Sequence, residues 1–283
     1  MSPQLLSDLP LTVARALAED VGTGDVTARL VRADQTGRAR VIARESAVLC
    51  GRPWVDEVFR QLDPTVNVAW LAAEGSRVEP EQVLFTVEGP SRSLLTGERT
   101  ALNFLQALSG TATETARYVE AVRGTGAQIV DTRKTLPGLR NAQKYAVGIG
   151  GGVNHRIGLY DGILIKENHI AAAGGIVAAI AQARALAANV PLMVEAESLD
   201  EVRSALAENV DLLLVDDFDA PALREAVRLT RAHRANGGRT RIEYSGGATL
   251  ARIRELAESG VDRISIGSLT KHVRAIDLSM RFA

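Results

Sequence analysis

The stretch IVDTRKTLPGLR, residues Ile129–Arg140, decides the fold class of this chain. Apolar and β-branched residues lead into Asp131, and the cationic pair Arg133-Lys134 follows at once. Pro137-Gly138 then ends the extended pattern, and a helical pattern begins. The stretch therefore predicts a strand that ends in a loop bearing two adjacent cations, followed by a helix.

The same order of strand, polar loop and helix recurs through the rest of the chain. The predicted strands are Gln128–Val130, Gly162–Ile165, Leu192–Val194, Leu212–Val215, Arg241–Tyr244 and Arg263–Ile266. The predicted helices between them include Gly175–Ala188, Leu199–Glu208, Ala220–Arg234 and Leu250–Ser259. Strands that alternate with helices are typical of a parallel sheet with right-handed crossovers. Six such units in roughly 160 residues favour an open or incomplete (β/α) barrel over a flat open sheet.

The first part of the chain lacks this regular alternation. Its predicted helices are Leu9–Asp20, Trp54–Leu62 and a long helical region from Ser91, and its predicted strands are Gly37–Cys50, Val66–Leu71 and Val83–Val87. We therefore predict an α/β protein with an N-terminal α+β sandwich domain, residues 1–110, followed by a (β/α) barrel domain, residues 111–274. Residues 276–282 alternate with period two, which predicts that the segment 275–283 returns to the first domain as a strand.

The composition is that of an ordinary globular protein, with 46% hydrophobic and 24% charged residues among 283. A formal net charge of −1 gives no general attraction to nucleic acid or to an anionic membrane. The single cysteine, Cys50, excludes an intrachain disulfide. The chain shows no signal peptide and no run of 18 or more apolar residues, so we expect a cytoplasmic protein without a membrane span.

Polar or charged residues and glycines stand where the predicted strands end. They are Asp131, Arg133, Lys134, Lys166, Glu195, Asp216, Ser245, Gly246, Gly247 and Gly267. In a (β/α) barrel such positions project onto the face that carries active sites. Together with His155 and Arg156, the cations predict a substrate that carries several negative charges.

Two features keep alternative interpretations open. Glu195 and Asp216 could hold sugar hydroxyls, hold a divalent metal or face a developing cation, but each could also form a buried ion pair with Lys166 or an arginine. The glycines in Ser245–Gly247 and Gly267-Ser268 could bind phosphate through bare backbone N–H groups, or could simply form tight turns. Neither His155 nor a second histidine, His169, which we expect to cap the segment after Lys166, has a partner at zinc-ligand spacing.

The acidic run Leu213–Asp217 invites comparison with the Rossmann-like phosphoribosyltransferases. Their acidic motif continues into a threonine-glycine loop, whereas this chain continues with Phe218-Asp219 and a predicted helix. The Rossmann-like alternative is therefore not supported.

Six motifs, taken together, resemble those of the quinolinate phosphoribosyltransferase family in sequence and order. They are Glu19–Thr27 (EDVGTGDVT), Glu98–Asn103 (ERTALN), Asp131–Thr135 (DTRKT), Asn154–Arg156 (NHR), Leu164–His169 (LIKENH) and Ser245–Gly247 (SGG). The resemblance covers essentially the whole chain. The sequence departs from the family pattern at Leu136 and Ala248, and neither departure replaces a charged residue.

This resemblance implies a type II phosphoribosyltransferase-like fold and a specific reaction. Quinolinate and phosphoribosyl pyrophosphate would give nicotinate mononucleotide, pyrophosphate and carbon dioxide for de novo NAD biosynthesis. The family is Mg²⁺-dependent and forms homodimers or assemblies of dimers, in which Arg99 matches the arginine lent by the neighbouring subunit.

From these residues we hypothesise the roles of individual side chains. The expected catalytic residues are Lys134, Lys166, Glu195 and Asp216, and the expected substrate-binding residues are these four with Arg99, Thr132, Arg133, His155, Arg156, Ser245, Gly246, Gly247 and Gly267. The arginines and His155 would hold the quinolinate carboxylates, the lysines would span both substrates, and the two acids would hold the ribose. No dedicated metal site is expected, because pyrophosphate would hold Mg²⁺, with Glu195 and Asp216 as further ligands.

Two other functions compete with this one. One is a sibling on the same scaffold, either a nicotinate phosphoribosyltransferase or the molybdenum-transport-associated protein. The number of cations separates these alternatives, since a substrate with one carboxylate needs fewer of them. A non-catalytic phosphosugar-binding or assembly protein would lack some of the charges at the strand ends, and none is missing.

Overall fold

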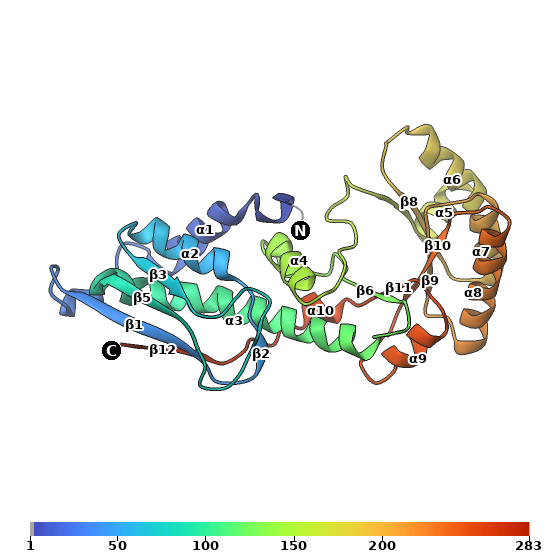
Figure 1. Ribbon diagram of the computed structural model, residues 1–283. Coiled ribbons are helices and arrows are strands. Elements are labelled where there is room, and N and C mark those ends of the chain that lie inside the picture. Colours follow the sequence, from blue (N-terminus) through green and yellow to red (C-terminus); the bar gives the residue numbers. More distant parts are fainter. Residues whose placement is uncertain (1–2, 283) are drawn as a thin grey trace. The chain divides into compact units, whose positions relative to one another are not determined.

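The computed structural model describes residues 3–282, which divide into two compact units (Figure 1). The first unit contains the residues up to 116, the segment 134–151 and the residues from 268 onward. The second unit contains residues 117–133 and 152–267. The predicted division at residue 110 falls inside a single continuous helix, α3 (Ser91–Ala121).

The first unit is built on an antiparallel sheet with strand order β12-β1-β5-β3. The strands are β1 (Thr36–Ala43), β3 (Asn67–Trp70), β5 (Val83–Pro90) and β12 (Leu278–Phe282), and β2 (Ala47–Val48) pairs separately with β4 (Arg77–Val78). The last strand, β12, pairs with β1 from Ala39↔Phe282 to Ala43↔Leu278. In β1, Ala39, Val41 and Ala43 are buried, as expected for a strand with one covered face, and Ile42 is also buried where the register shifts.

Helices complete the first unit. They are η1 (Pro3–Leu6), α1 (Leu9–Val21), η2 (Ala28–Leu30), α2 (Arg52–Leu62), α4 (Arg140–Ile149), α10 (Ser268–Lys271) and most of α3. Gly110 lies inside α3, where an added Cβ would come within 2.1 Å of the carbonyl oxygen of Arg274. Only glycine lets the chain that leads to β12 pass this close to the helix backbone.

The second unit contains a six-stranded parallel sheet with the order β6-β11-β10-β9-β8-β7. The strands are β6 (Gln128–Val130), β7 (Ile163–Ile165), β8 (Leu192–Ala196), β9 (Leu212–Asp216), β10 (Arg241–Ser245) and β11 (Arg263–Ser265). Since β6 and β7 are the two edges of this sheet, the barrel is open. The predicted strands and the predicted incomplete (β/α) barrel are confirmed.

The helices of the second unit connect these parallel strands. They are α5 (Glu167–Ala173), α6 (Ile176–Ala185), α7 (Leu199–Ala207), α8 (Ala220–Ala235) and α9 (Ile253–Glu258), and α6, α7 and α8 flank the sheet (Figure 1). The short helix α5 was not predicted, because no polar loop separates it from β7. Its first turn is closed by His169 Nδ1, which accepts the Lys166 backbone N–H at 3.1 Å, so the predicted capping role of His169 is confirmed.

One prediction in this unit was too long. The helix expected at Leu250–Ser259 begins only at Ile253, because residues 250–252 form a turn. The glycines of Ser245–Gly247 therefore do not lie at the N-terminus of that helix. Across residues 3–282, no helix combines the length and apolar character needed to cross a membrane.

Candidate active site

Strand register places the predicted charged residues of the second unit on one edge of the sheet. Lys166 directly follows β7, Glu195 is the fourth residue of β8, and Asp216 and Ser245 end β9 and β10. Glu195 is in register with Leu214, and Asp216 is in register with Ser245. Because side chains alternate along a strand, Glu195, Asp216 and Ser245 point to the same face of the sheet.

Lys166 and Glu195 form an ion pair at this edge. Lys166 Nζ lies 2.7 Å from both Glu195 Oε1 and Oε2. The Glu195 side chain is 9% exposed and the Lys166 side chain is 42% exposed. The ion-pair alternative is therefore correct for Glu195 in this structure, and the lysine is the partner that solvent and a ligand can reach.

The turn after β10 packs tightly against the end of β9. Gly246 has φ +94, and a Cβ there would lie 2.9 Å from the backbone nitrogen of Asp217. Asp217 itself has φ +54, which is uncommon for a residue with a side chain, and its N–H donates to the Ser245 carbonyl at 3.0 Å. This packing brings the bare backbone of Gly246-Gly247 beside Asp216.

Asp131 joins two of the sequence motifs. It is fully buried and accepts hydrogen bonds from Asn154 Nδ2 at 2.7 Å and from the His155 backbone N–H at 2.8 Å. The preceding residue, Val130, forms a parallel bridge with Val153. The aspartate of the DTRKT motif thus fixes the loop that carries the NHR motif.

The NHR loop places a second arginine close to the DTRKT motif. Arg156 Nη1 donates to the Gly162 carbonyl at 3.0 Å. Burial lowers the pKa of Arg156, and the neighbouring positive charge of Arg133 lowers this pKa further, while the negative charge of Asp161 opposes both. Two partly buried guanidinium groups that repel each other are stabilised by an anion, and a carboxylate matches their geometry.

The other predicted residues fall into two groups. Thr132 directly precedes Arg133, and Gly267 closely follows β11, so both belong to the second unit. Arg99 is exposed on α3, and Lys134 is exposed with its carbonyl oxygen accepting the Thr270 hydroxyl at 2.8 Å; both belong to the first unit. Their part in the site remains a prediction.

The carboxylates do not form a ready-made metal site. Within residues 3–282, no group of three or more histidine, cysteine, aspartate or glutamate side chains could hold a metal ion. Glu195 is bound to Lys166, whereas Asp216 is half-buried and has no side-chain hydrogen bond or ion pair to any described residue. Carboxylate oxygen is a donor that suits Mg²⁺, so Asp216 fits as one ligand of an ion held mainly by a bound substrate.

Two sequence models of known families match almost the whole chain. The model described as "Quinolinate phosphoribosyl transferase, N-terminal domain" matches residues 25–109, and the model of the C-terminal domain matches residues 111–281. This chain belongs to the quinolinate phosphoribosyl transferase family.

Individual members of the family are similar along most of their length. The "Nicotinate-nucleotide pyrophosphorylase [carboxylating]" of Mycobacterium leprae is 43% identical over 276 residues, covering 95% of both chains. A "Probable nicotinate-nucleotide pyrophosphorylase [carboxylating]" of Synechocystis is 42% identical over 269 residues, covering 94% of this chain and 89% of the relative. The solved structure of the Francisella tularensis nicotinate-nucleotide pyrophosphorylase superposes with a TM-score of 0.93 at 42% identity, covering 100% of this chain and 98% of the other.

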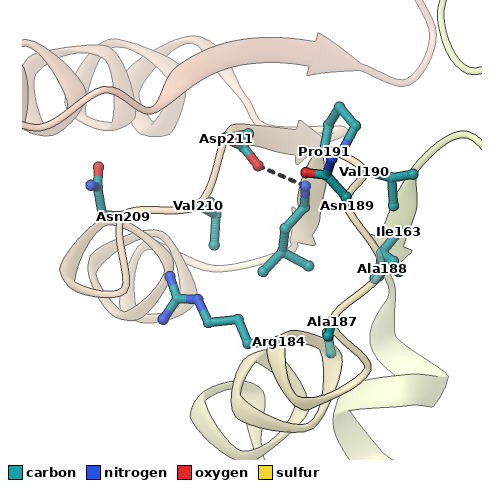
Figure 2. Close-up of a pocket in the computed structure, with 12 residues that line it drawn as sticks. Ile163, Arg184, Ala187, Ala188, Asn189, Val190, Pro191, Asn209, Val210 and Asp211 are labelled. Carbon is teal, nitrogen blue, oxygen red and sulfur yellow. Dashed lines mark hydrogen bonds between the residues drawn. The ribbon is translucent and has the colours of Figure 1, made fainter.

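A cavity of about 650 Å³ in the second unit lies away from these residues (Figure 2). Its lining includes Ile163 and Leu192, which begin β7 and β8, and Asp211, which directly precedes β9. It therefore opens at the amino ends of the strands, the edge that serves stability in (β/α) barrels. Asp211 is already used there, since it accepts the Leu192 backbone N–H at 2.7 Å (Figure 2).

Sequence reasoning missed a buried charge below the site. Glu243 on β10 is fully buried, and its Oε2 lies 3.4 Å from Nε of Arg263 on β11. Burial raises the pKa of Glu243 to about 7, although the charge of Arg263 opposes this shift. The available signal was a carboxylate within the predicted strand Arg241–Tyr244, where an apolar residue is the rule.

Proposed function

We infer that this family member is a quinolinate phosphoribosyltransferase of de novo NAD biosynthesis. It transfers the phosphoribosyl group of phosphoribosyl pyrophosphate to the ring nitrogen of quinolinate, with loss of pyrophosphate and carbon dioxide. The observation that carries this inference is the neighbouring pair Arg133 and Arg156 at the edge that also holds Lys166, Glu195 and Asp216. A substrate with two carboxylates presents two anions that arginine side chains can contact.

In the proposed reaction, residues at this edge of the sheet hold the ribose and a phosphate group while one bond to ribose C1 breaks and another forms. Asp216 and the Glu195–Lys166 pair hold the ribose, and the bare backbone of Gly246-Gly247 accepts a phosphate group. As the bond from ribose C1 to pyrophosphate breaks, the ribose gains positive charge, which the two carboxylates stabilise. The ring nitrogen of quinolinate then bonds to C1 from the opposite side, and positioning supplies much of the rate.

Decarboxylation follows from the same step. When the bond to the adjacent carboxylate breaks and carbon dioxide leaves, its electron pair stays on the ring carbon, where the positive charge of the neighbouring quaternised nitrogen stabilises it. The ring carbon then takes a proton to give nicotinate mononucleotide. No covalent intermediate with the enzyme is needed.

A divalent cation is part of the proposal. Mg²⁺ would neutralise charge on the pyrophosphate. We propose that the pyrophosphate holds it, with Asp216 and Glu195 as additional protein ligands; Glu195 would have to share its oxygens with Lys166, which bonds both in this structure.

We also propose a homodimer, or an assembly of dimers, in which Arg99 enters the site of the neighbouring subunit. The support is that Arg99 is exposed on α3 and lies in the motif ERTALN, which matches the family pattern. A cytoplasmic location is proposed on the single, buried cysteine, which needs no oxidising compartment.

A steady-state comparison of acceptors tests this function. Purified protein with Mg²⁺ and phosphoribosyl pyrophosphate is expected to release pyrophosphate with quinolinate and to show little turnover with nicotinate. A preference for nicotinate would establish the sibling activity instead, although the relatives from Mycobacterium leprae and Synechocystis both carry carboxylating in their names. Binding of phosphoribosyl pyrophosphate without turnover of either acceptor would favour a non-catalytic protein.

A further inference from the structure

The buried Glu243 lies one layer below the residues that reach the active-site edge. It is in register with Leu214 on β9 and with Arg263 on β11. Ser245 follows it by two residues on the same strand, so Glu243 points to the same face of the sheet as Ser245 and Asp216. Its carboxylate therefore sits inside the barrel, directly beneath the proposed substrate site.

Glu243 is surrounded by charged groups from several segments. Arg263 lies across from it on β11, Asp131 approaches from the end of β6, and Arg241 stands on its own strand. The Oε1 atom of Glu243 lies 3.7 Å from Nε2 of His155, and these two side chains are 0% and 9% exposed. Within residues 3–282, neither oxygen of Glu243 makes a hydrogen bond of standard geometry, but the nearby hydroxyl of Ser265 on β11 lowers the pKa of this carboxyl.

The hydrogen bonding of His155 determines which of its two ring nitrogens carries the proton. The Arg156 backbone N–H donates to His155 Nδ1 at 2.7 Å. A nitrogen that accepts a hydrogen bond carries no proton, so the ring proton is on Nε2. The Nε2–H dipole therefore faces the Glu243 carboxylate, at a distance too long for a hydrogen bond but close enough for an electrostatic attraction to orient the ring in this buried setting.

We propose that Glu243 is a positioning residue of the active site, which orients His155 and through it holds the backbone of Arg156 in place. The chain of contacts runs from Glu243 Oε1 to His155 Nε2, and from His155 Nδ1 to the Arg156 N–H. Asp131 holds the same loop from its other side through the His155 N–H. This proposal rests on the proposed function, because it assigns Arg156 to the binding of a quinolinate carboxylate.

The proposal gives a reason for keeping a carboxylate in the barrel interior. An apolar residue at this position would avoid the cost of burying a charge. Burial raises the pKa of Glu243 to about 7, so its charge changes near neutral pH. The effect of Glu243 on the orientation of His155 is therefore expected to weaken as the pH falls below 7.

Glu243→Gln tests the proposal, because it keeps the shape of the side chain and removes the charge. The KM for quinolinate is expected to rise about tenfold, as for the loss of one contact to a charged group, while the KM for phosphoribosyl pyrophosphate stays within about twofold. The acid limb of the quinolinate kcat/KM profile near pH 7 should disappear. Glu258→Gln, at an exposed glutamate on α9, is the matched control and should behave as wild type.

A double-mutant cycle distinguishes action through His155 from a separate structural role. If Glu243 acts through His155, then Glu243→Gln in a His155→Asn background adds little further loss. Additive effects on the KM for quinolinate would overturn the proposal. If Glu243→Gln alone does not fold, the paired change Glu243→Gln with Arg263→Gln removes both charges of this pair, and a wild-type KM in the double variant would equally overturn the proposal.

Hydrogen exchange of one amide tests the same contact without any turnover. In Glu243→Gln, the Arg156 backbone N–H should exchange at least about tenfold faster, whereas the Leu192 N–H, which donates to Asp211, should keep its rate. An unchanged Arg156 rate would contradict the role of Glu243. Wild-type protein that fails to turn over quinolinate would instead refute the proposed function, and the exchange result would still decide the part played by Glu243.

Discussion

Lys166 Nζ lies 2.7 Å from each carboxylate oxygen of Glu195, across two neighbouring strands of the second unit. The glutamate is buried and the lysine is partly exposed. This ion pair holds the Glu195 carboxylate next to the place where ribose is proposed to gain positive charge. It also holds Lys166 in a position where an incoming anion can contact its ammonium group.

Removal of either partner of this pair is expected to lower activity strongly. Lys166→Met would leave the buried Glu195 without its counter-charge, and Glu195→Gln would remove the carboxylate from the proposed ribose contact. Each change should lower kcat/KM by about 100-fold or more. Because the two side chains act as a unit, the double variant should lose much less than the product of the single losses, and a strictly multiplicative loss would show that they act independently.

Arg133→Ala is expected to weaken the hold on a quinolinate carboxylate. The loss of a guanidinium that binds the substrate should cost a few kcal/mol of transition-state stabilisation, on the order of a 100-fold fall in kcat/KM. Arg123→Ala is the matched control, because Arg123 is 77% exposed and pairs with Glu120 on the surface. Normal kcat/KM in Arg133→Ala would remove this residue from the site.

Subunit mixing tests the proposed placement of Arg99. Arg99→Ala and Lys166→Ala should each be nearly inactive as homodimers. After random reassociation, half of the dimers are mixed and each mixed dimer keeps one intact site, so about a quarter of wild-type activity should return. No recovery, with mixed dimers verified by mass, would show that Arg99 does not act across an interface.

Gly246→Ala is expected to disturb the turn beside Asp216. The backbone at φ +94 disfavours a side chain, and the added Cβ would press against the Asp217 backbone. Gly237→Ala is the matched control, because it has φ +90 but open space within 4 Å. Both variants should lose about 1 kcal/mol of stability from the backbone conformation, but only Gly246→Ala should raise the KM for phosphoribosyl pyrophosphate. Equal KM values in the two variants would argue against a phosphate-binding role for this turn.

The free energy of unfolding should depend on pH through the titration of Glu243. Burial raises the pKa of Glu243 from its ordinary 4.5 to about 7, so the folded state binds this proton more tightly than the unfolded state. The contribution of Glu243 to the free energy of unfolding is therefore present below pH 4.5 and is lost as the pH rises to 7. The loss is on the order of 3 kcal/mol, because each tenfold difference in proton affinity between the two states corresponds to about 1.4 kcal/mol.

Denaturant unfolding at a series of pH values measures this effect. The difference in unfolding free energy between wild type and Glu243→Gln should shift in favour of the variant as the pH rises through this range. A pH-independent difference would mean that the Glu243 carboxyl titrates at its ordinary pH when folded.

The sequence allowed the second unit to be predicted well because parallel strands leave a strong local pattern. The strands at Leu192 and Leu212 are uninterrupted apolar runs, and the residue at the end of each can be read directly. Glu195 and Asp216 were predicted as site residues on this basis, and the structure places them on the same face of the sheet.

The features that were not predicted depend on contacts between distant segments. The pairing of Lys166 with Glu195 was one of several open alternatives, since sequence spacing does not measure a distance between strands. The role of Asp131 in holding the NHR loop requires knowing that Val153 lies beside Val130. The burial of Glu243 requires the strand register, and the late start of α9 depends on a turn that helical periodicity does not reveal.

The most direct test of the central claim is the fate of the carboxylate next to the ring nitrogen of quinolinate. Quinolinate labelled in that carboxylate is incubated with purified protein, Mg²⁺ and phosphoribosyl pyrophosphate. The account predicts labelled carbon dioxide, nicotinate mononucleotide and pyrophosphate in equal amounts. Pyrophosphate release without labelled carbon dioxide, or no product from quinolinate at all, would contradict it.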